Sequence, residues 1–154
     1  MDYMELFRQI NEGKLDNLYL FHGPEEFTKE EALNQILTQW IPQQYRDLNY
    51  QVIDGMETTA DAIIAASETL PFLSDKRIVV VKEYPGLTGQ KAENEDKLKK
   101  YLGRVPGSTC LVFYVRGDAD KKRSLYKAIA KHGNVVEFER LNHPDLVKWA
   151  RKRF

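Results

Sequence analysis

An apolar run without alternation, RIVVVKEY over residues 77–84, constrains the fold more than any other segment of this chain. A strand with one face in water alternates apolar and polar residues, whereas this run has four successive β-branched residues. Its continuity predicts a strand that is covered on both faces, as in a parallel sheet. Further apolar runs at residues 17–23 and 108–115 predict two more strands, and the first of them has the character of a buried strand.

Helical patterns alternate with the strands along the chain. Asp2 with Glu5, and Thr28 with Glu31, have the spacing of capping boxes at the starts of two helices. Because the connections are short, the alternation predicts an α/β fold in three layers, αβα, with a five-stranded parallel sheet and right-handed crossovers. The predicted elements are helices at 2–13, 28–40, 59–70, 93–103, 124–133 and 143–154, strands at 17–23, 50–55, 77–84, 108–115 and 134–141, and a polar loop at 85–95.

Charge is unevenly distributed along the chain, although the total is zero. The 154 residues carry 23 Lys and Arg against 23 Asp and Glu. Residues 1–75 carry 4 basic and 14 acidic side chains, a net of −10, and residues 76–154 carry 19 and 9, a net of +10. Such asymmetry indicates either an interaction surface or solvated helix faces. A zero total would argue against a nucleic-acid binder, but this division weakens that argument.

The composition is that of an ordinary globular protein. Hydrophobic residues make up 42% and charged residues 30%, which excludes a disordered chain. The lone cysteine, Cys110, lies in an apolar run and is interpreted as a buried, inert thiol. The N-terminal residues lack the apolar core of a signal peptide, and every apolar run is far shorter than the ~20 residues that span a bilayer. We therefore expect a cytoplasmic protein without a membrane partner.

The first strand-to-helix turn contains a partial phosphate loop. In the working pattern, GxxxxGK[ST], backbone N–H groups hold phosphate, the lysine reaches the terminal phosphates and the hydroxyl holds Mg²⁺. Gly23 and Lys29 have the required spacing, but Thr28 replaces the second glycine and Glu30 replaces the hydroxyl residue. Neighbouring glutamates add negative charge at a helix N-terminus that would otherwise attract an anion. The segment therefore argues against nucleotide binding.

The strand at 77–84 lacks the acidic pair that holds magnesium in ATPases. Lys82 puts a cation at the position of the metal-binding aspartate, and Glu83 follows it. A solvated strand end explains both residues without a ligand. With a degenerate phosphate loop and no metal-binding pair, we expect no cofactor, no metal site and no catalytic residue in this domain.

The order of these segments resembles the N-terminal domain of the delta subunit of bacterial DNA polymerase III, the wrench of the clamp loader. The resemblance covers essentially the whole chain and rests on NLYLFHGPEEFTKEEAL, VIDG, ETLPFLSDKRIVVVKEY, STCLVFYV, DKKRSLYKAIAKHGNVVEFERL and PDLVKWARKRF. It implies an AAA+-like P-loop domain over residues 1–142, with strand order 5-1-4-3-2 and a lost nucleotide site. Residues 143–154 would begin the helical lid domain, and the rest of that domain and the collar domain would be absent.

The same resemblance implies a clamp-binding element directly after the helix at 59–70. In the family, adjacent bulky apolar residues at this place enter a hydrophobic pocket on the sliding clamp, the beta subunit. The matching residues are Leu70, Pro71, Phe72 and Leu73. Pro71 stands where some members carry a leucine, so either Leu70 or Leu73 would accompany Phe72 as the anchor. From the residues alone, these side chains would be assigned to the core, and the resemblance reverses that assignment.

Basic side chains recur over residues 121–131. Loader assemblies hold primer–template DNA, and Lys121, Lys122, Arg123 and Lys127 are candidates for contact with its phosphates. A solvated helix face explains these residues without a ligand and is the preferred interpretation.

Taken together, the resemblance implies a clamp-loader fragment that binds the sliding clamp and helps to open the ring during DNA replication, without binding or hydrolysing ATP. The domain would not be an enzyme itself, although DNA polymerase III as a whole is a DNA-directed DNA polymerase, a nucleotidyltransferase. Other clamp-loader subunits would be partners of the full-length protein through the collar domain. Two alternatives remain open, an active P-loop nucleotide-binding enzyme that uses Lys29 and a stand-alone DNA-binding module.

In the implied strand order, strands from both halves of the chain interleave, so the charge division along the chain does not become a division between two ends. Right-handed crossovers place the helix at 28–40 on one face and the helices at 59–70, 93–103 and 124–133 on the other. We therefore expect one acidic and one more basic face, with the clamp-binding residues at an end of the basic one. Residues 74–77 would form a polar rim beside them.

Overall fold

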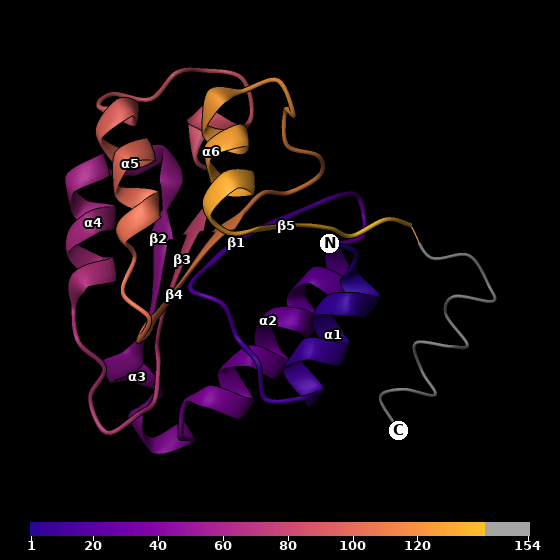
Figure 1. Ribbon diagram of the computed structural model, residues 1–154, viewed down its shortest axis with the longest axis vertical. Coiled ribbons are helices and arrows are strands. Elements are labelled where there is room, and N and C mark those ends of the chain that lie inside the picture. The colour runs from indigo at the N-terminus through magenta and orange to yellow at the C-terminus, as the bar shows by residue number, and fades with distance from the viewer. Residues whose placement is uncertain (141–154) are drawn as a thin grey trace.

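The computed structural model describes residues 1–140, so the predicted helix at 143–154 lies outside the described residues. Within residues 1–140, five parallel strands form one sheet in the order β2-β3-β4-β1-β5 (Figure 1). The predicted order 5-1-4-3-2 is the same order counted from the other edge, and it is confirmed. The strands are β1 (Leu18–His22), β2 (Tyr50–Asp54), β3 (Arg77–Lys82), β4 (Thr109–Tyr114) and β5 (Asn134–Glu137).

The three central strands are buried on both faces, as the apolar runs predict. Every residue of β1 and β4 is buried, and so is every residue of β3 before Lys82. Leu111 of β4 pairs with Leu18 on one side and with Val79 on the other, so apolar residues align across the strands. Because each face of such a sheet needs its own cover, helices are required on both sides.

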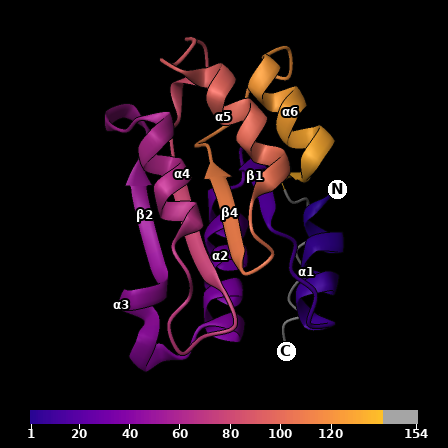
Figure 2. The same cartoon turned by 60° about the vertical axis from the view of Figure 1, so that its left-hand side comes forward.

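Two helical layers supply this cover (Figures 1 and 2). α1 and α2 pack on one face, in a core that contains Ile78 and Val80 of β3. α4, α5 and α6 pack on the other face, in a core that contains Val79 and Val81. The predicted three-layer αβα architecture is therefore confirmed. None of the helices within residues 1–140 combines the length and apolarity needed to cross a membrane. The helices are α1 (Tyr3–Asn11), α2 (Glu26–Trp40), α3 (Arg46–Asn49), α4 (Ala60–Glu68), α5 (Glu95–Tyr101) and α6 (Ser124–His132).

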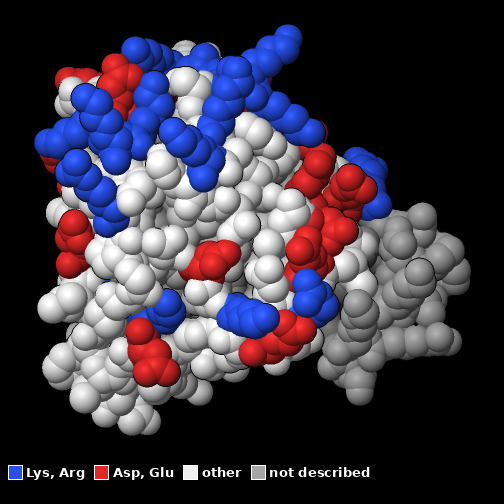
Figure 3. Space-filling view, viewed as in Figure 1, with Lys and Arg blue, Asp and Glu red and all other residues white. Residues whose placement is uncertain are grey.

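The two helical layers differ in charge. α2 carries Glu26, Glu30 and Glu31 in its first two turns, whereas α5 and α6 carry several lysines. Figure 3 shows Lys and Arg crowded over the upper ends of α5 and α6, and a band of Asp and Glu between α6 and α1. α4 departs from this division, because its only charged side chains are those of Asp61 and Glu68, and Asp61 pairs with Lys97 of α5. The predicted basic face thus carries lysines over α5 and α6, and the prediction is wrong at α4.

Of the two predicted capping boxes, one is confirmed at its N-cap and the other is wrong. Asp2 caps α1 by accepting a hydrogen bond from the backbone N–H of Glu5 at 2.8 Å. α2 begins before its predicted cap, so Thr28 is buried inside the helix and its hydroxyl donates to the carbonyl of Glu25 at 3.3 Å. The N–H of Glu25 donates to the carbonyl of Phe138 at 3.1 Å. This long-range bond holds the turn before α2 and has no local sequence signal.

Several connections differ from the predicted ones. Residues 43–49 form a 3-10 turn followed by the short helix α3, where no element is predicted. The predicted polar loop at 85–95 begins with a 3-10 turn whose Gly86 and Leu87 are buried, and β5 ends at Glu137 rather than at residue 141. Such short elements have little periodicity of their own, and packing decides them. The 3-10 turns are Gln43–Tyr45, Gly55–Glu57, Pro85–Leu87 and Leu102–Arg104.

We expect Cys110 to resist thiol reagents while the protein is folded. Its side chain is completely buried in β4, and burial raises the pKa of the thiol to about 12. Near pH 8 the sulfur is therefore neither ionised nor accessible, so labelling by an aromatic disulfide reagent should proceed only as fast as the chain opens. The same reaction in urea is the control, and equal labelling rates with and without urea would contradict the buried position.

Candidate functional site

A turn of bulky apolar side chains, residues 70–73, connects α4 to β3 and is called the apolar turn below. Leu70, Phe72 and Leu73 are 76%, 55% and 60% exposed, and Pro71 between them is half-buried. The turn lies at the amino-terminal edge of the sheet, where the chain between α4 and β3 runs beside α3 (Figure 1). The alternative that these side chains fill the core is therefore wrong for all three exposed residues.

The backbone of the apolar turn is held by Asn49, a buried residue at the end of α3. Its Oδ1 accepts a hydrogen bond from the N–H of Phe72 at 2.6 Å, and its Nδ2 donates to the carbonyl of Phe72 at 2.7 Å. The same Nδ2 donates to the carbonyl of Tyr45 at 2.9 Å. The ring of Tyr45 stands edge-on to that of Phe72, with centroids 6.3 Å apart. Phe72 thus projects from a backbone that is fixed on both sides.

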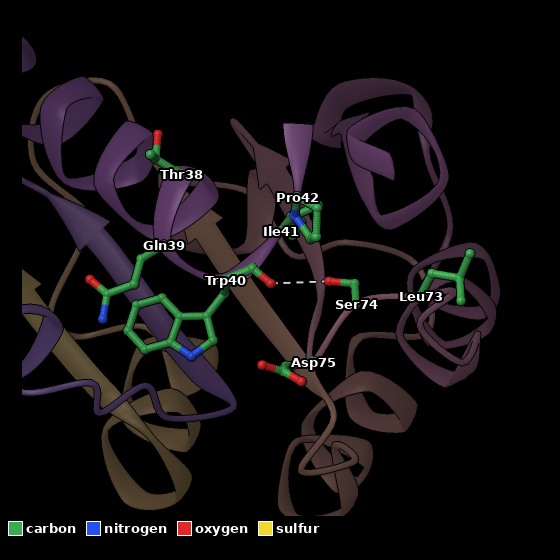
Figure 4. A pocket seen from close by; sticks show the side chains of 8 residues that line it. All are labelled: Thr38, Gln39, Trp40, Ile41, Pro42, Leu73, Ser74 and Asp75. Atoms are coloured by element: carbon green, nitrogen blue, oxygen red, sulfur yellow. Dashed lines mark hydrogen bonds between the residues drawn. The ribbon is translucent and has the colours of Figure 1, made fainter. Parts of the chain in front are cut away.

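An open pocket of about 370 Å³ lies beside the apolar turn (Figure 4). It is lined by residues 38–42, from the end of α2, and by residues 73–75. The hydroxyl of Ser74 lies 3.0 Å from the carbonyl oxygen of Trp40 and joins the two segments. Leu73 has a φ of 53°, a left-handed backbone conformation that side chains rarely adopt. The pocket and the apolar turn therefore form one continuous surface with a defined shape.

Arg77 is buried rather than exposed, which corrects the prediction of a polar rim over residues 74–77. Its guanidinium donates to the carbonyl of Ala66 at 2.9 Å, to the carbonyl of Leu48 at 3.2 Å and to Oε1 of Gln51 at 2.5 Å. Burial lowers the pKa of this guanidinium, which stays charged at any physiological pH. The three bonds join α4, α3 and β2 beneath the apolar turn.

The partial phosphate loop, at the carboxyl end of β1, is closed by the chain's own backbone. Gly23 has a φ of 120°, and a Cβ added to it would lie 2.4 Å from the carbonyl oxygen of Phe138. The N–H of Gly23 donates to the carbonyl of Gly117 at 2.7 Å, and the N–H of Glu25 donates to that of Phe138. Glycine is therefore required here by a close approach of two protein segments. Two backbone amides of the loop, those of Gly23 and Glu25, thus have partners within the chain.

Lys29, which would reach the terminal phosphates in a working loop, is completely buried. Its Nζ donates to Oε2 of Glu26 at 2.7 Å and to the carbonyl of Val115 at 2.8 Å, and lies 5.5 Å from the ring centroid of Tyr114. The same carboxylate oxygen of Glu26 accepts the N–H of Gly117 at 3.1 Å. Lys29 therefore ties the start of α2 to the chain that follows β4.

The remaining residues of the degenerate site gather around Tyr114. Its hydroxyl donates to Oε1 of Glu30 at 3.1 Å, and Nζ of Lys82 lies 5.2 Å from its ring centroid. Burial and the Glu30 carboxylate raise the pKa of Tyr114, so its hydroxyl keeps its proton. Glu83 accepts a hydrogen bond from the N–H of Arg116 at 2.7 Å. Within residues 1–140, no three His, Cys, Asp or Glu side chains are grouped as metal ligands would be.

The basic residues that are candidates for DNA contact lie at the start of α6, over which Figure 3 shows crowded positive charge. Lys121, Lys122 and Lys127 are exposed. Lys121 Nζ lies 3.8 Å from a carboxylate oxygen of Glu137 in β5. Arg123 is half-buried and directs its guanidinium toward carbonyls of the loop that follows β3. The structure therefore brings these four residues together and gives Arg123 a structural contact.

Sequence reasoning missed the two residues that support the apolar turn. Asn49 contacts Phe72 across 23 positions, and Tyr45 belongs to the unpredicted segment between α2 and β2. It also missed His22, which is buried at the end of β1 and whose Nδ1 accepts the N–H of Ala119 at 3.2 Å. Burial lowers the pKa of His22, so this imidazole stays neutral. The apolar pattern of strand β1 indicates burial at this position, but nothing local identifies the partners.

Replacing Lys29 by alanine should lower the free energy of unfolding by about 3 kcal/mol, because the Val115 carbonyl and the Glu26 carboxylate lose their common partner. Urea unfolding followed by circular dichroism measures this change. Lys14→Ala is the matched control, since the Lys14 side chain is 70% exposed beside Glu12, and it should change stability by less than about 0.5 kcal/mol. A Lys29→Ala variant as stable as the unmodified protein would contradict the structural role of the buried Lys29.

Comparisons with known proteins show which family this chain resembles in sequence and in fold. A family model described as DNA polymerase III, delta subunit, matches residues 19–139. The DNA polymerase III subunit delta of Bacillus subtilis (strain 168) is 28% identical over 144 residues, which cover 90% of this chain and 42% of the relative. The structure is similar to that of the Bacillus subtilis DNA clamp loader delta protein, with a TM-score of 0.84 and 27% identity over 96% of this chain and 45% of that one. The chain thus spans less than half the length of these relatives.

Two further structures share the fold at lower identity. A DNA polymerase III gamma subunit-related protein of Thermotoga maritima has a TM-score of 0.61 and 20% identity, over 96% of this chain and 49% of that one. The RuvB Holliday junction branch migration motor of the same organism has a TM-score of 0.55 and 15% identity, over 94% and 45%. Both support the AAA+-like fold alone. Because the delta subunit model matches most of the chain, from β1 to just beyond β5, this chain belongs to the DNA polymerase III delta subunit family.

Proposed function

We propose that this domain binds a sliding clamp through the apolar turn and, as part of a clamp loader, helps to open the ring during DNA replication. The observation that carries the proposal is the exposure of Leu70, Phe72 and Leu73 on one turn with a fixed backbone. Scattered exposed apolar side chains need no explanation, but a contiguous group on a stiff turn is typical of a binding site. Membership of the delta subunit family supports the choice of a sliding clamp as the partner.

Phe72 is the anchor in this proposal. Aromatic side chains near the centre of an interface carry much of its binding energy, and burying one apolar side chain contributes about 1.5–3 kcal/mol. Leu70 and Leu73 are both exposed and both adjoin the anchor. Leu73 also lines the pocket at the end of α2, so a partner that covers Phe72 and Leu73 would meet a continuous surface.

We infer in addition that this domain neither binds nor hydrolyses ATP and is not itself an enzyme. Lys29 is buried in its bonds to Glu26 and Val115, and the amides of Gly23 and Glu25 are bonded to carbonyls of the chain. A triphosphate would have to displace these bonds and approach the carboxylates at the start of α2. In this proposal the domain acts by binding, and contacts with other loader subunits belong to the parts of the longer relatives that this chain does not span.

Contact with primer–template DNA stays a prediction for the four basic residues at the start of α6. Three of them are exposed lysines, which are compatible with phosphate contacts and equally with a solvated helix face. The alternatives of an active P-loop enzyme and of a stand-alone DNA-binding module have less support, because Lys29 is buried and solvated helix faces account for the basic side chains.

Phe72→Ala should weaken binding to the sliding clamp of the organism that this chain comes from by at least about tenfold, because it removes the aromatic anchor. Titration calorimetry or a biosensor with immobilised clamp measures the affinity. Phe27→Ala is the matched control, since Phe27 is also exposed, at 62%, but lies at the start of α2. It should bind the clamp as the unmodified protein does.

Leu70→Ala and Leu73→Ala, tested singly, should show which leucine accompanies Phe72, because the true partner loses more affinity when it is truncated. The same clamp-binding assay applies to both variants. A double variant, Phe72→Ala with Leu73→Ala, that bound the clamp with unchanged affinity would overturn the assigned site.

Titration of the protein with ATP and Mg²⁺ should give no saturable heat at concentrations up to the millimolar range, because the Lys29 ammonium is already bonded and the turn at Gly23 is closed by the chain's own backbone. Isothermal calorimetry makes this measurement without a chemical label. Saturable binding in the micromolar range would contradict the proposed loss of the nucleotide site and favour the enzyme alternative.

A further inference from the structure

The side chain of Asn49 is completely buried, and its amide bonds to the backbone of two segments at the surface, at Tyr45 and at Phe72. The N–H and the carbonyl of Phe72 both bond to it, at 2.6 and 2.7 Å. In a β-sheet, a residue of the neighbouring strand bonds to both the N–H and the carbonyl of one residue. Here the amide side chain of Asn49 makes both bonds. Because Asn49 and Phe72 are 23 positions apart, the contact holds the apolar turn from outside the turn itself.

The bonding pattern requires an amide. Aspartate has the same shape but no N–H, so it would face the carbonyls of Phe72 and Tyr45 with a carboxylate oxygen. Alanine would leave both polar groups of Phe72 without their partner and would release the turn. The residue type at position 49 is therefore explained by the backbone of the apolar turn.

Asn49 is itself held in place. Arg77 donates to the carbonyl of Leu48, the residue before Asn49, and to the carbonyl of Ala66 in α4. Tyr45, which lies directly before α3, packs its ring edge-on against the Phe72 ring. The apolar turn is thus supported by hydrogen bonds of Arg77 that connect α3 and α4, and these bonds form without any partner protein.

We propose that Asn49 is a positioning residue for clamp binding, an inference that rests on the proposed function. By holding Phe72 in place before the partner arrives, it lowers the conformational entropy that is lost on binding. The partner site is then an apolar pocket that accepts a preformed turn, and no flexible segment has to fold onto it. The protein should accordingly bind the clamp more tightly than the same residues do in a flexible peptide.

The test compares clamp binding by the protein, by its Asn49→Ala and Asn49→Asp variants and by a linear peptide of residues 67–76. We expect the protein to bind about tenfold more tightly than the peptide, and both variants to lose most of this advantage. Asn17→Ala is the matched control, because Nδ2 of Asn17 also donates to a backbone carbonyl, that of Val105 at 2.7 Å. It should lose stability in urea, as Asn49→Ala does, and yet keep full affinity for the clamp.

Hydrogen exchange of the Phe72 amide adds a direct readout, which should be slow in the protein and fast in Asn49→Ala, where the oxygen that accepts this N–H is missing. If the protein binds the clamp and Phe72→Ala does not, but both Asn49 variants bind as tightly as the protein, the positioning role is overturned and the proposed function stands. A protein that binds no more tightly than the peptide also overturns the role, even where the variants fail to fold. Absence of any clamp binding by the protein would overturn the proposed function itself.

Discussion

Burial of β1, β3 and β4 on both faces is the constraint on which the rest of the structure depends. Parallel strands that are apolar on both sides need helices over each face, and the crossovers bring all the amino ends to one edge of the sheet and all the carboxyl ends to the other. The apolar turn precedes β3 and lies at the amino edge, whereas the partial phosphate loop follows β1 at the carboxyl edge. The two segments that stand out in the sequence are therefore separated by the length of the strands.

At the carboxyl edge, the residues of the partial phosphate loop are bonded to other groups of the chain itself. Lys29 bonds to Glu26 and to the Val115 carbonyl, and the turn at Gly23 is closed by Gly117 and Phe138. Where the sequence departs from the phosphate-loop motif, the two residues that still match it, Gly23 and Lys29, have structural contacts within the chain. Lysine and glycine are still needed, because a buried cation and a close backbone approach now hold the sheet and α2 together.

At the amino edge, the backbone of the apolar turn is held by Asn49, a residue outside the turn. The prediction identified residues 70–73 and their setting after a helix, but adjacent bulky apolar residues are equally typical of a core. Exposure could not be predicted, because it depends on whether another element covers the turn. The same limit explains two errors. The turn before Thr28 is held by a bond from Glu25 to the distant Phe138, and Arg77 is buried against α3, α4 and β2.

The sequence by itself determined the α/β class, the positions of the five strands and the failure of the phosphate-loop motif, because apolar runs and motif spacing are local properties. Its resemblance to the delta subunit family implied the strand order and the partner that is proposed. Only the tertiary structure decided that Lys29 is a structural tie, that the apolar turn is exposed and that Asn49 holds it. These roles rest on hydrogen bonds between residues 86 and 23 positions apart, and the fold alone brings such residues together.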